Sequence, residues 1–144
     1  DMDGTIVEYR VFPENFVTTE TKKVFLNAEP LEVILKNLEK INEIDNLDVY
    51  ILSLARSFII VEEKKQWLKK YAPFIREENY ILLNKENGDY NAENREFIKS
   101  IKMMEKLNEY DYVILLDDDH KILKRTLNEV GKNGEVFHVS SATM

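Results

Sequence analysis

The sequence has 144 residues and a formal net charge of −7, because 27 Asp and Glu outnumber 20 Lys and Arg. It has no cysteine, which excludes a disulfide scaffold, a cysteine zinc site and a thiol nucleophile, and its acidic balance argues against a protein that coats nucleic acid. The 44% of hydrophobic residues suffices for the core of one domain over residues 1–144, and without a membrane-spanning apolar stretch or a signal peptide we expect a cytoplasmic protein.

Helical patterns alternate with short apolar runs along the chain. Apolar residues recur at spacings of three and four after Pro30 and between the runs, which predicts helices, whereas the runs lack polar alternation and predict buried parallel strands. In chain order we expect a helix over 31–41, a strand over 49–52, a helix over 61–71, a strand over 80–83, a helix over 92–108, a strand over 112–116, a helix over 120–130 and a strand over 136–139.

This order is typical of an α/β domain with a doubly wound, Rossmann-like parallel sheet and helices on both of its faces. Residues 8–29 contain several aromatic side chains but show no firm period. We therefore expect at most a small cap or insert, within about residues 8–45, beside the sheet.

Two carboxylates lie two residues apart in the opening sequence DMDGTIV. If Asp1 and Asp3 end a strand, their side chains point to the same side of it, so one could attack a substrate while the other moves a proton. Gly4 permits a backbone conformation that other residues resist. The alternative is an acidic segment with no chemical role.

Three aspartates, residues 117–119, directly follow the third apolar run. At the carboxyl end of a buried parallel strand they would lie where open α/β sheets bind ligands. Adjacent acids repel one another unless a cation is nearby, and hard oxygen ligands without cysteine favour Mg²⁺ over zinc. The alternative is a solvated acidic loop that caps the helix expected to begin near His120.

A serine and a lysine complete the candidate chemistry. Ser53 follows the strand expected over 49–52 and could donate a hydrogen bond to a phosphate oxygen, although a serine at a strand end needs no function. A phosphate site also needs positive charge, for which Lys64, Lys85 and Lys99 are the candidates. Each of them is by default a solvated surface lysine.

The order of DMDGTIV, a strand ending in Ser53, a lysine and ILLDDD resembles the motif order of the haloacid dehalogenase-like (HAD) superfamily over nearly the whole chain. The resemblance implies a Mg²⁺-dependent phosphatase that works through an aspartyl-phosphate, on a nucleotide or another small phosphorylated metabolite. In that family the nucleophile ends a central apolar strand, and since nothing precedes Asp1 here we expect this first strand to lie upstream of the given sequence.

The resemblance also implies roles for individual residues. Asp1 would be the nucleophile, and Asp3 would protonate the leaving alcohol and then activate water. Ser53 would hold a phosphoryl oxygen, and we expect further substrate contacts from Gly4 and Arg56.

The metal ligands implied by the resemblance come from both ends of the chain. Asp117 and Asp118 would bind or orient Mg²⁺, together with the Asp1 carboxylate and the main-chain carbonyl of Asp3.

Two branches of the superfamily suggest different phosphate-binding lysines. The segments 87–89 (NGD) and 97–99 (FIK) resemble polynucleotide 3′-phosphatase domains, which favours Lys99. Residues 63–68 (EKKQWL) resemble a helix of 5′-deoxyribonucleotidases, in which Lys85 would take this role, and Lys64 is a further alternative.

Two other functions remain open at this stage. One is a 3′-phosphatase that acts on nucleic acid ends, which the net charge disfavours because such proteins usually present a basic footprint. The residues that could still form a local basic patch are Arg56, Lys64, Lys65, Lys69 and Lys70. The other is a catalytically inactive binding module with the same fold.

Overall fold

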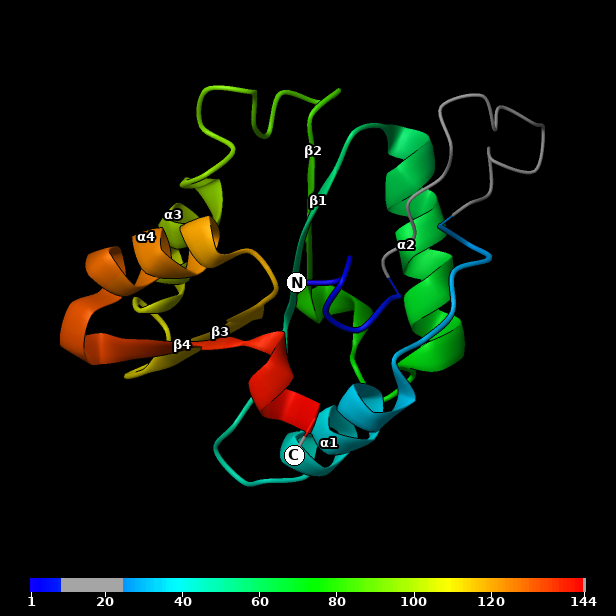
Figure 1. The fold of residues 1–144 in the computed structure, drawn as a ribbon, viewed down its shortest axis with the longest axis horizontal. Coiled ribbons are helices and arrows are strands. Elements are labelled where there is room, and N and C mark those ends of the chain that lie inside the picture. Colours follow the sequence, from blue (N-terminus) through cyan, green and yellow to red (C-terminus); the bar gives the residue numbers. More distant parts are fainter. Residues whose placement is uncertain (9–24, 144) are drawn as a thin grey trace.

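The structure is a computed structural model that describes residues 1–8 and 25–143 (Figure 1). Strands and helices alternate along the chain, as the sequence predicts. The elements are α1 (Glu32–Asn42), β1 (Ile51–Ala55), α2 (Phe58–Tyr71), β2 (Tyr80–Asn84), α3 (Ile98–Lys106), β3 (Val113–Asp117), α4 (His120–Val130) and β4 (Gly134–His138). Short 3-10 helices cover Glu77–Asn79, Gly131–Asn133 and Val139–Thr143.

All strand pairs among the described residues are parallel, but they form two sheets and not the single sheet expected. β1 pairs with β2, and β3 pairs with β4. The N-terminal segment contacts both pairs: the main-chain nitrogen of Asp1 donates to the Leu116 carbonyl oxygen of β3 at 3.1 Å, and Asp3 shares the Lys64 ammonium with Ser53 of β1. Residues 1–7 form tight turns, since the nitrogens of Thr5, Ile6 and Val7 all donate to the Met2 carbonyl.

The strand expected over 49–52 begins two residues later and extends to Ala55. Ser53 therefore lies inside β1, where it is in register with Leu82 of β2, and does not follow the strand end. Backbone pairing with β2 sets the length of β1, and a serine can continue a strand whose ladder is intact.

Helix starts differ from the expectation where polar side chains bind the backbone. α2 begins at Phe58 and not at residue 61, because Ser57 caps it by accepting from the Ile60 nitrogen at 3.4 Å. α3 begins at Ile98 and not at residue 92, because the Asn91 and Asn94 side chains accept from nearby backbone nitrogens and hold the preceding residues in turns. α4 has the expected bounds.

Two apolar clusters lie on opposite sides of the strands, with α1 and α2 on one side and α3 and α4 on the other (Figure 1). Successive strand residues point to opposite faces, so Ile51 joins the first cluster and Leu52 the second. In the β1–β2 pair, Leu52 and Leu83 share the second cluster with Ile98 and Met103 of α3. The β3–β4 pair differs, because Ile114 is 54% and Phe137 is 41% exposed, so one of its faces is partly uncovered.

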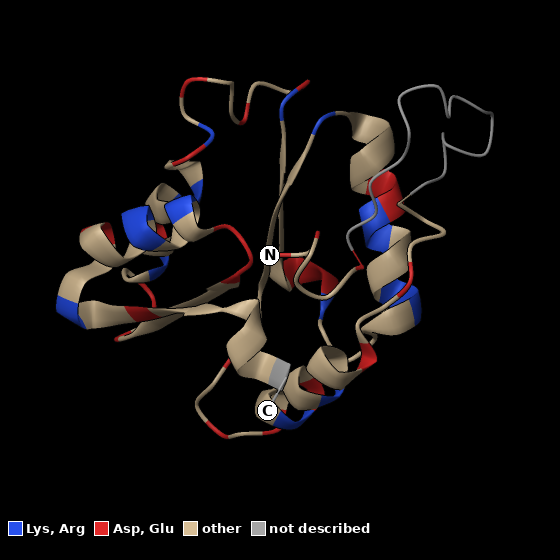
Figure 2. Cartoon of the chain, viewed as in Figure 1, with Lys and Arg blue, Asp and Glu red and all other residues tan. Residues whose placement is uncertain are grey.

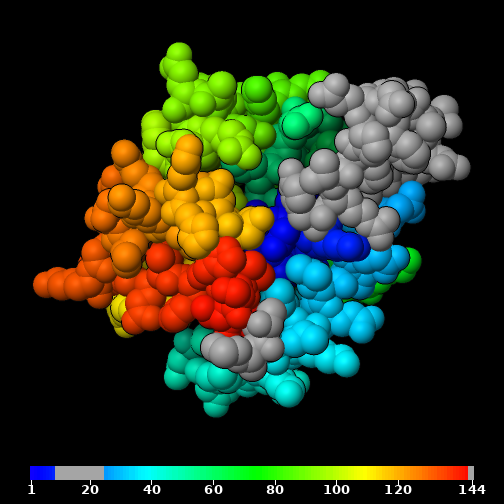
Figure 3. All heavy atoms as spheres, in the orientation of Figure 1, coloured from blue at the N-terminus to red at the C-terminus, as the bar shows by residue number. Residues whose placement is uncertain are grey.

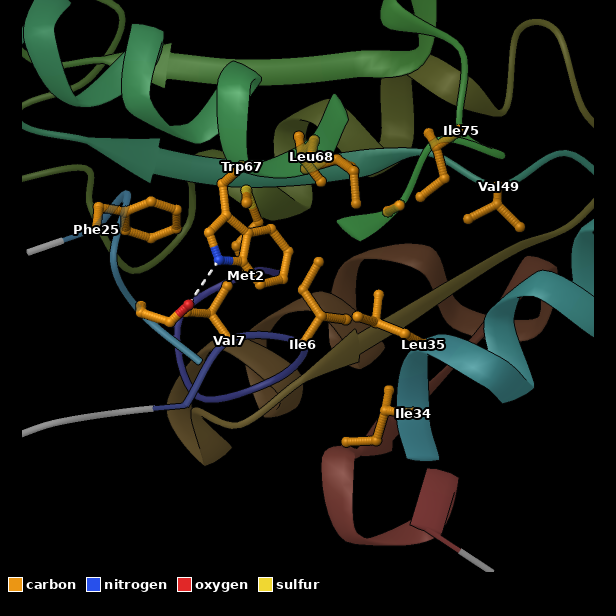
Figure 4. Packing of buried hydrophobic residues seen from close by; sticks show 13 residues of the cluster. Met2, Ile6, Val7, Phe25, Ile34, Leu35, Val49, Trp67, Leu68 and Ile75 are labelled. Atoms are coloured by element: carbon orange, nitrogen blue, oxygen red, sulfur yellow. Dashed lines mark hydrogen bonds between the residues drawn. The ribbon is translucent and has the colours of Figure 1, made fainter. Parts of the chain in front are cut away.

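The first cluster fixes the N-terminal segment. Trp67 is fully buried beside Phe25, Met2 and Val7, and its indole nitrogen donates to the Ala28 carbonyl at 2.9 Å (Figure 4). Burial of one such side chain stabilises the fold by about 1.5–3 kcal/mol. Met2 has no exposed surface, and it therefore anchors the stretch between Asp1 and Asp3.

Part of the expected cap or insert lies outside the described residues, namely residues 9–24. Among those that follow, Phe25, Ile34 and Leu35 belong to the first core cluster. No helix in the described parts of the chain is both long and apolar enough to cross a membrane.

Candidate functional site

Residues from both ends of the chain meet between the two strand pairs. In Figure 2 the acidic loop after β3 runs beside the N-terminal segment, and Figure 3 shows residues 1–8 reaching the surface near the centre of this face. Two buried lysines, Lys64 from α2 and Lys99 from α3, bind this segment. The predicted meeting of DMD with DDD is therefore present in the structure.

The Lys99 cluster consists of Asp1, Lys99 and Asp117. The Lys99 ammonium donates to Asp1 Oδ1 at 2.9 Å and to Asp117 Oδ2 at 2.7 Å. Thr5, to which the sequence assigned no role, donates its hydroxyl to Asp1 Oδ2 at 3.1 Å. Burial alone would raise the pKa of Asp117, but the Lys99 ammonium, the Asp1 amino group and the Asp119 main-chain N–H together outweigh it and hold that pKa below its ordinary value.

The Lys64 cluster consists of Asp3, Ser53 and Lys64. The Lys64 ammonium donates to Asp3 Oδ2 at 2.9 Å, to Ser53 Oγ at 2.7 Å and to the Leu54 carbonyl at 2.7 Å. These three acceptors match the three protons of the ammonium. Burial lowers the pKa of Lys64, and the Asp3 carboxylate opposes that shift.

Gly4 lies directly against Asp118. Its φ of +74° is in the left-handed region, and a Cβ at this position would overlap Asp118 Oδ2. Burial, followed by the charge of Asp117, raises the pKa of Asp118. Only a residue without a side chain fits between the N-terminal turn and this carboxylate.

The carboxylates of Asp1, Asp117 and Asp118 form an acidic triad in which one oxygen from each lies within 4.8 Å of the others. The main-chain carbonyl of Asp3, the fourth predicted ligand, accepts no backbone hydrogen bond from the described residues. Oxygen donors of this kind suit Mg²⁺. The three carboxylates are therefore close enough, and of the right chemistry, to hold a metal ion.

Asp119 has a structural role. Its side chain accepts from the main-chain nitrogens of Lys121 at 2.9 Å and Ile122 at 3.3 Å and so caps α4. Its own nitrogen donates to Asp117 Oδ1 at 3.0 Å. Both roles considered for these three aspartates are therefore present in the loop. Asp119 caps α4, whereas Asp117 and Asp118 lie beside the N-terminal turn.

Two candidate residues stand apart from these clusters. Lys85, after β2, and Arg56, after β1, are exposed, and no hydrogen bond or ion pair joins them to the described residues of the two clusters. The residue missed by sequence reasoning is Thr5. The sequence could have indicated this contact, because Thr5 belongs to DMDGT and a tight turn brings the fifth residue of that motif back to the first.

Comparisons with protein-family models, with curated proteins and with solved structures each found no match to this chain. The structure itself shows an α/β fold with parallel strands and an acidic triad. The HAD resemblance accordingly depends on motif order in the sequence and on the arrangement of these side chains.

Proposed function

We propose that the protein is a HAD-type phosphomonoester hydrolase that requires Mg²⁺ and works through an aspartyl-phosphate. The observation that carries this proposal is the convergence of Asp1 with Asp117 and Asp118, from opposite ends of the chain, around one small volume. The Lys99 ammonium offsets one of these three negative charges, and the remaining excess favours a further cation among the carboxylates. A bound Mg²⁺ would supply positive charge opposite the phosphoryl oxygens.

The chain's own residues then divide the reaction into two displacements. A carboxylate oxygen of Asp1 attacks phosphorus, the bond to the ester oxygen breaks, and Asp3 gives its proton to that oxygen. Water next attacks the aspartyl-phosphate, Asp3 takes the proton from the water, and the Asp1 carboxylate is released with inorganic phosphate. The Lys99 ammonium orients Asp1 and offsets negative charge during both displacements.

A nucleotide or another small phosphorylated metabolite is the substrate class we favour. The residues considered for a basic patch do not combine on the surface, because Lys64 is buried while Lys65 and Lys69 pair with Glu62 and Glu77 at 3.7 and 3.3 Å. This supports a small substrate over a nucleic acid end, whose recognition needs several phosphate contacts.

The test is phosphate release from a panel of phosphomonoesters that includes nucleoside monophosphates, sugar phosphates, p-nitrophenyl phosphate and a 3′-phosphorylated oligonucleotide. We expect release with Mg²⁺ and its loss in EDTA. A preference for the oligonucleotide that weakens steeply with salt would favour the nucleic-acid alternative. No release with any substrate and any of Mg²⁺, Mn²⁺ or Ca²⁺ would contradict the proposal and favour the inactive binding module.

A further inference from the structure

We propose that Lys64 is a positioning residue that holds the Asp3 carboxyl and the Ser53 hydroxyl as one unit, and that it thereby sets how well the leaving-group oxygen is protonated. This inference rests on the proposed function. It gives the two buried lysines different roles, since Lys99 binds Asp1 and Asp117 while Lys64 binds Asp3 and Ser53.

The position of Lys64 is fixed by the helix that carries it. Lys64, Trp67 and Leu68 lie on one face of α2, because residues three and four apart are neighbours on a helix, and all three are buried. The Trp67 indole is tied to the Ala28 carbonyl, and the Phe25 ring centroid is 5.0 Å from the Lys64 ammonium. The lysine therefore cannot move away without disturbing the first core cluster.

Lys64 binds only one of the two carboxylate oxygens of Asp3. The ammonium binds Oδ2, whereas Asp3 Oδ1 makes no hydrogen bond to the described residues. The Asp3 side chain is 48% exposed, so its second oxygen is accessible to a substrate. In the first displacement the proton then travels from Asp3 Oδ1 to the ester oxygen as the bond between phosphorus and that oxygen breaks.

A framework role alone does not account for these partners. Burying an ammonium is unfavourable unless hydrogen bonds compensate for its lost water, and a methionine would fill the same volume without that penalty. Two of the three acceptors are the side chains of Asp3, which the proposed reaction uses, and of Ser53, to which the HAD resemblance assigns a phosphoryl oxygen. The lysine also joins β1 to the N-terminal turn, two parts that no backbone ladder connects.

The dependence on the leaving group tests this role. p-Nitrophenolate departs without a proton, whereas the alkoxide of glycerol phosphate needs one, and general acid catalysis contributes roughly 10²–10⁴-fold. We expect Lys64→Met to lower kcat/KM for glycerol phosphate about 100-fold and for p-nitrophenyl phosphate less than about 10-fold. Lys64→Gln, which keeps one donor for Asp3, should recover part of the loss for glycerol phosphate.

Three further variants complete the experiment. Asp3→Asn should show the same asymmetry, and the Lys64→Met/Asp3→Asn double variant should lose little beyond Asp3→Asn, because both changes remove one function. The control is Lys69→Met, on the same helix but exposed and paired with Glu77, which should leave both substrates unaffected.

The role of Lys64 would be overturned if Lys64→Met lowered kcat/KM equally for both substrates. It would also be overturned if the loss in the double variant were the product of the losses in the two single variants. Failure of both Lys64 variants to fold, as judged by circular dichroism, would overturn it as well, because it would make the lysine part of the framework. An inactive wild-type protein would instead contradict the proposed function itself, so the two failures are distinguishable.

Discussion

The Lys99 and Lys64 clusters use the same device in different electrostatic settings. In each, a buried lysine joins one N-terminal aspartate to a residue of a strand. Lys99 lies between two carboxylates, so its cluster keeps one negative charge and the adjacent Asp118 can add a second. Lys64 has one carboxylate, one hydroxyl and one carbonyl as partners, so its cluster is formally neutral.

This difference indicates a division of labour. Excess negative charge in a buried place favours a cation, which suits the Lys99 cluster to the metal and the nucleophile. Asp3 in the Lys64 cluster is 48% exposed and can therefore meet a substrate, which suits this cluster to proton transfer. Variants of the two clusters should therefore lose activity in different ways. The variant with the largest expected loss of activity comes first.

Asp1→Asn should abolish turnover. The amide keeps the size of the side chain and can still accept from Lys99 through its oxygen, but it is not a nucleophile toward phosphorus. We expect kcat to fall by about 10⁴-fold or more, with a circular dichroism spectrum like that of the wild type. Phosphate release from p-nitrophenyl phosphate measures the loss.

The matched control for this change is Asp111→Asn, an exposed aspartate before β3, which should be fully active. Activity of Asp1→Asn within about 10-fold of the wild type would remove Asp1 from the mechanism.

Lys99→Met should come next. Without the ammonium, Asp117, which is 1% exposed, loses its ion pair of 2.7 Å and keeps the hydrogen bond from the Asp119 nitrogen, so no ammonium separates its charge from that of Asp1. Leaving a buried charge unpaired is destabilising by roughly 3–5 kcal/mol, so we expect a lower Tm in EDTA. Activity should fall about 10²–10³-fold on p-nitrophenyl phosphate and glycerol phosphate alike, because charge stabilisation does not depend on the leaving group.

Mg²⁺ separates this explanation from a simple packing defect. If the metal can replace the lost positive charge, it should raise the Tm of Lys99→Met more than that of the wild type. Lys102→Met, on the same helix, removes only a surface contact of 3.2 Å to Glu105 and should change neither Tm nor activity appreciably. A Tm of Lys99→Met that ignores Mg²⁺ would argue against a cation among these carboxylates.

The acidic half of the site could be predicted from sequence because local rules determine it. Asp1 and Asp3 flank Met2, whose burial anchors the turn that carries both carboxylates. Asp117 ends β3, and the carboxyl ends of parallel strands are where such sheets bind ligands. The division into two sheets was not predictable in this way, because strand pairing depends on distant segments.

The choice of lysine depended on packing. Lys64 and Lys99 are buried because the helix faces that carry them turn inward, with Trp67 three residues after Lys64 and Met103 four residues after Lys99. Lys85 lies in a turn after β2 and has no such neighbours. The helical spacing was visible in the sequence, but it could not show that two lysines enter the site.

Gly4→Ala should have the smallest effect, and it tests the contact between the N-terminal turn and Asp118. The new methyl group would overlap Asp118 Oδ2 and push that carboxylate away from Asp1 and Asp117. We expect the Mg²⁺ concentration for half-maximal activity to rise about 10-fold or more, as for other changes that misplace a metal ligand. Activity measured across a Mg²⁺ titration gives this value directly.

Gly88→Ala separates the overlap at Gly4 from backbone strain. Gly88 has a φ of +83°, but no atom of the described residues lies within 4 Å of a Cβ placed there. Both alanines therefore carry the penalty of a left-handed backbone, about 1–2 kcal/mol, whereas only the one at Gly4 meets a carboxylate. Both variants should lose Tm, and only Gly4→Ala should shift the Mg²⁺ titration. A shift of the same size in both would mean that strain, and not the displacement of Asp118, weakens metal binding.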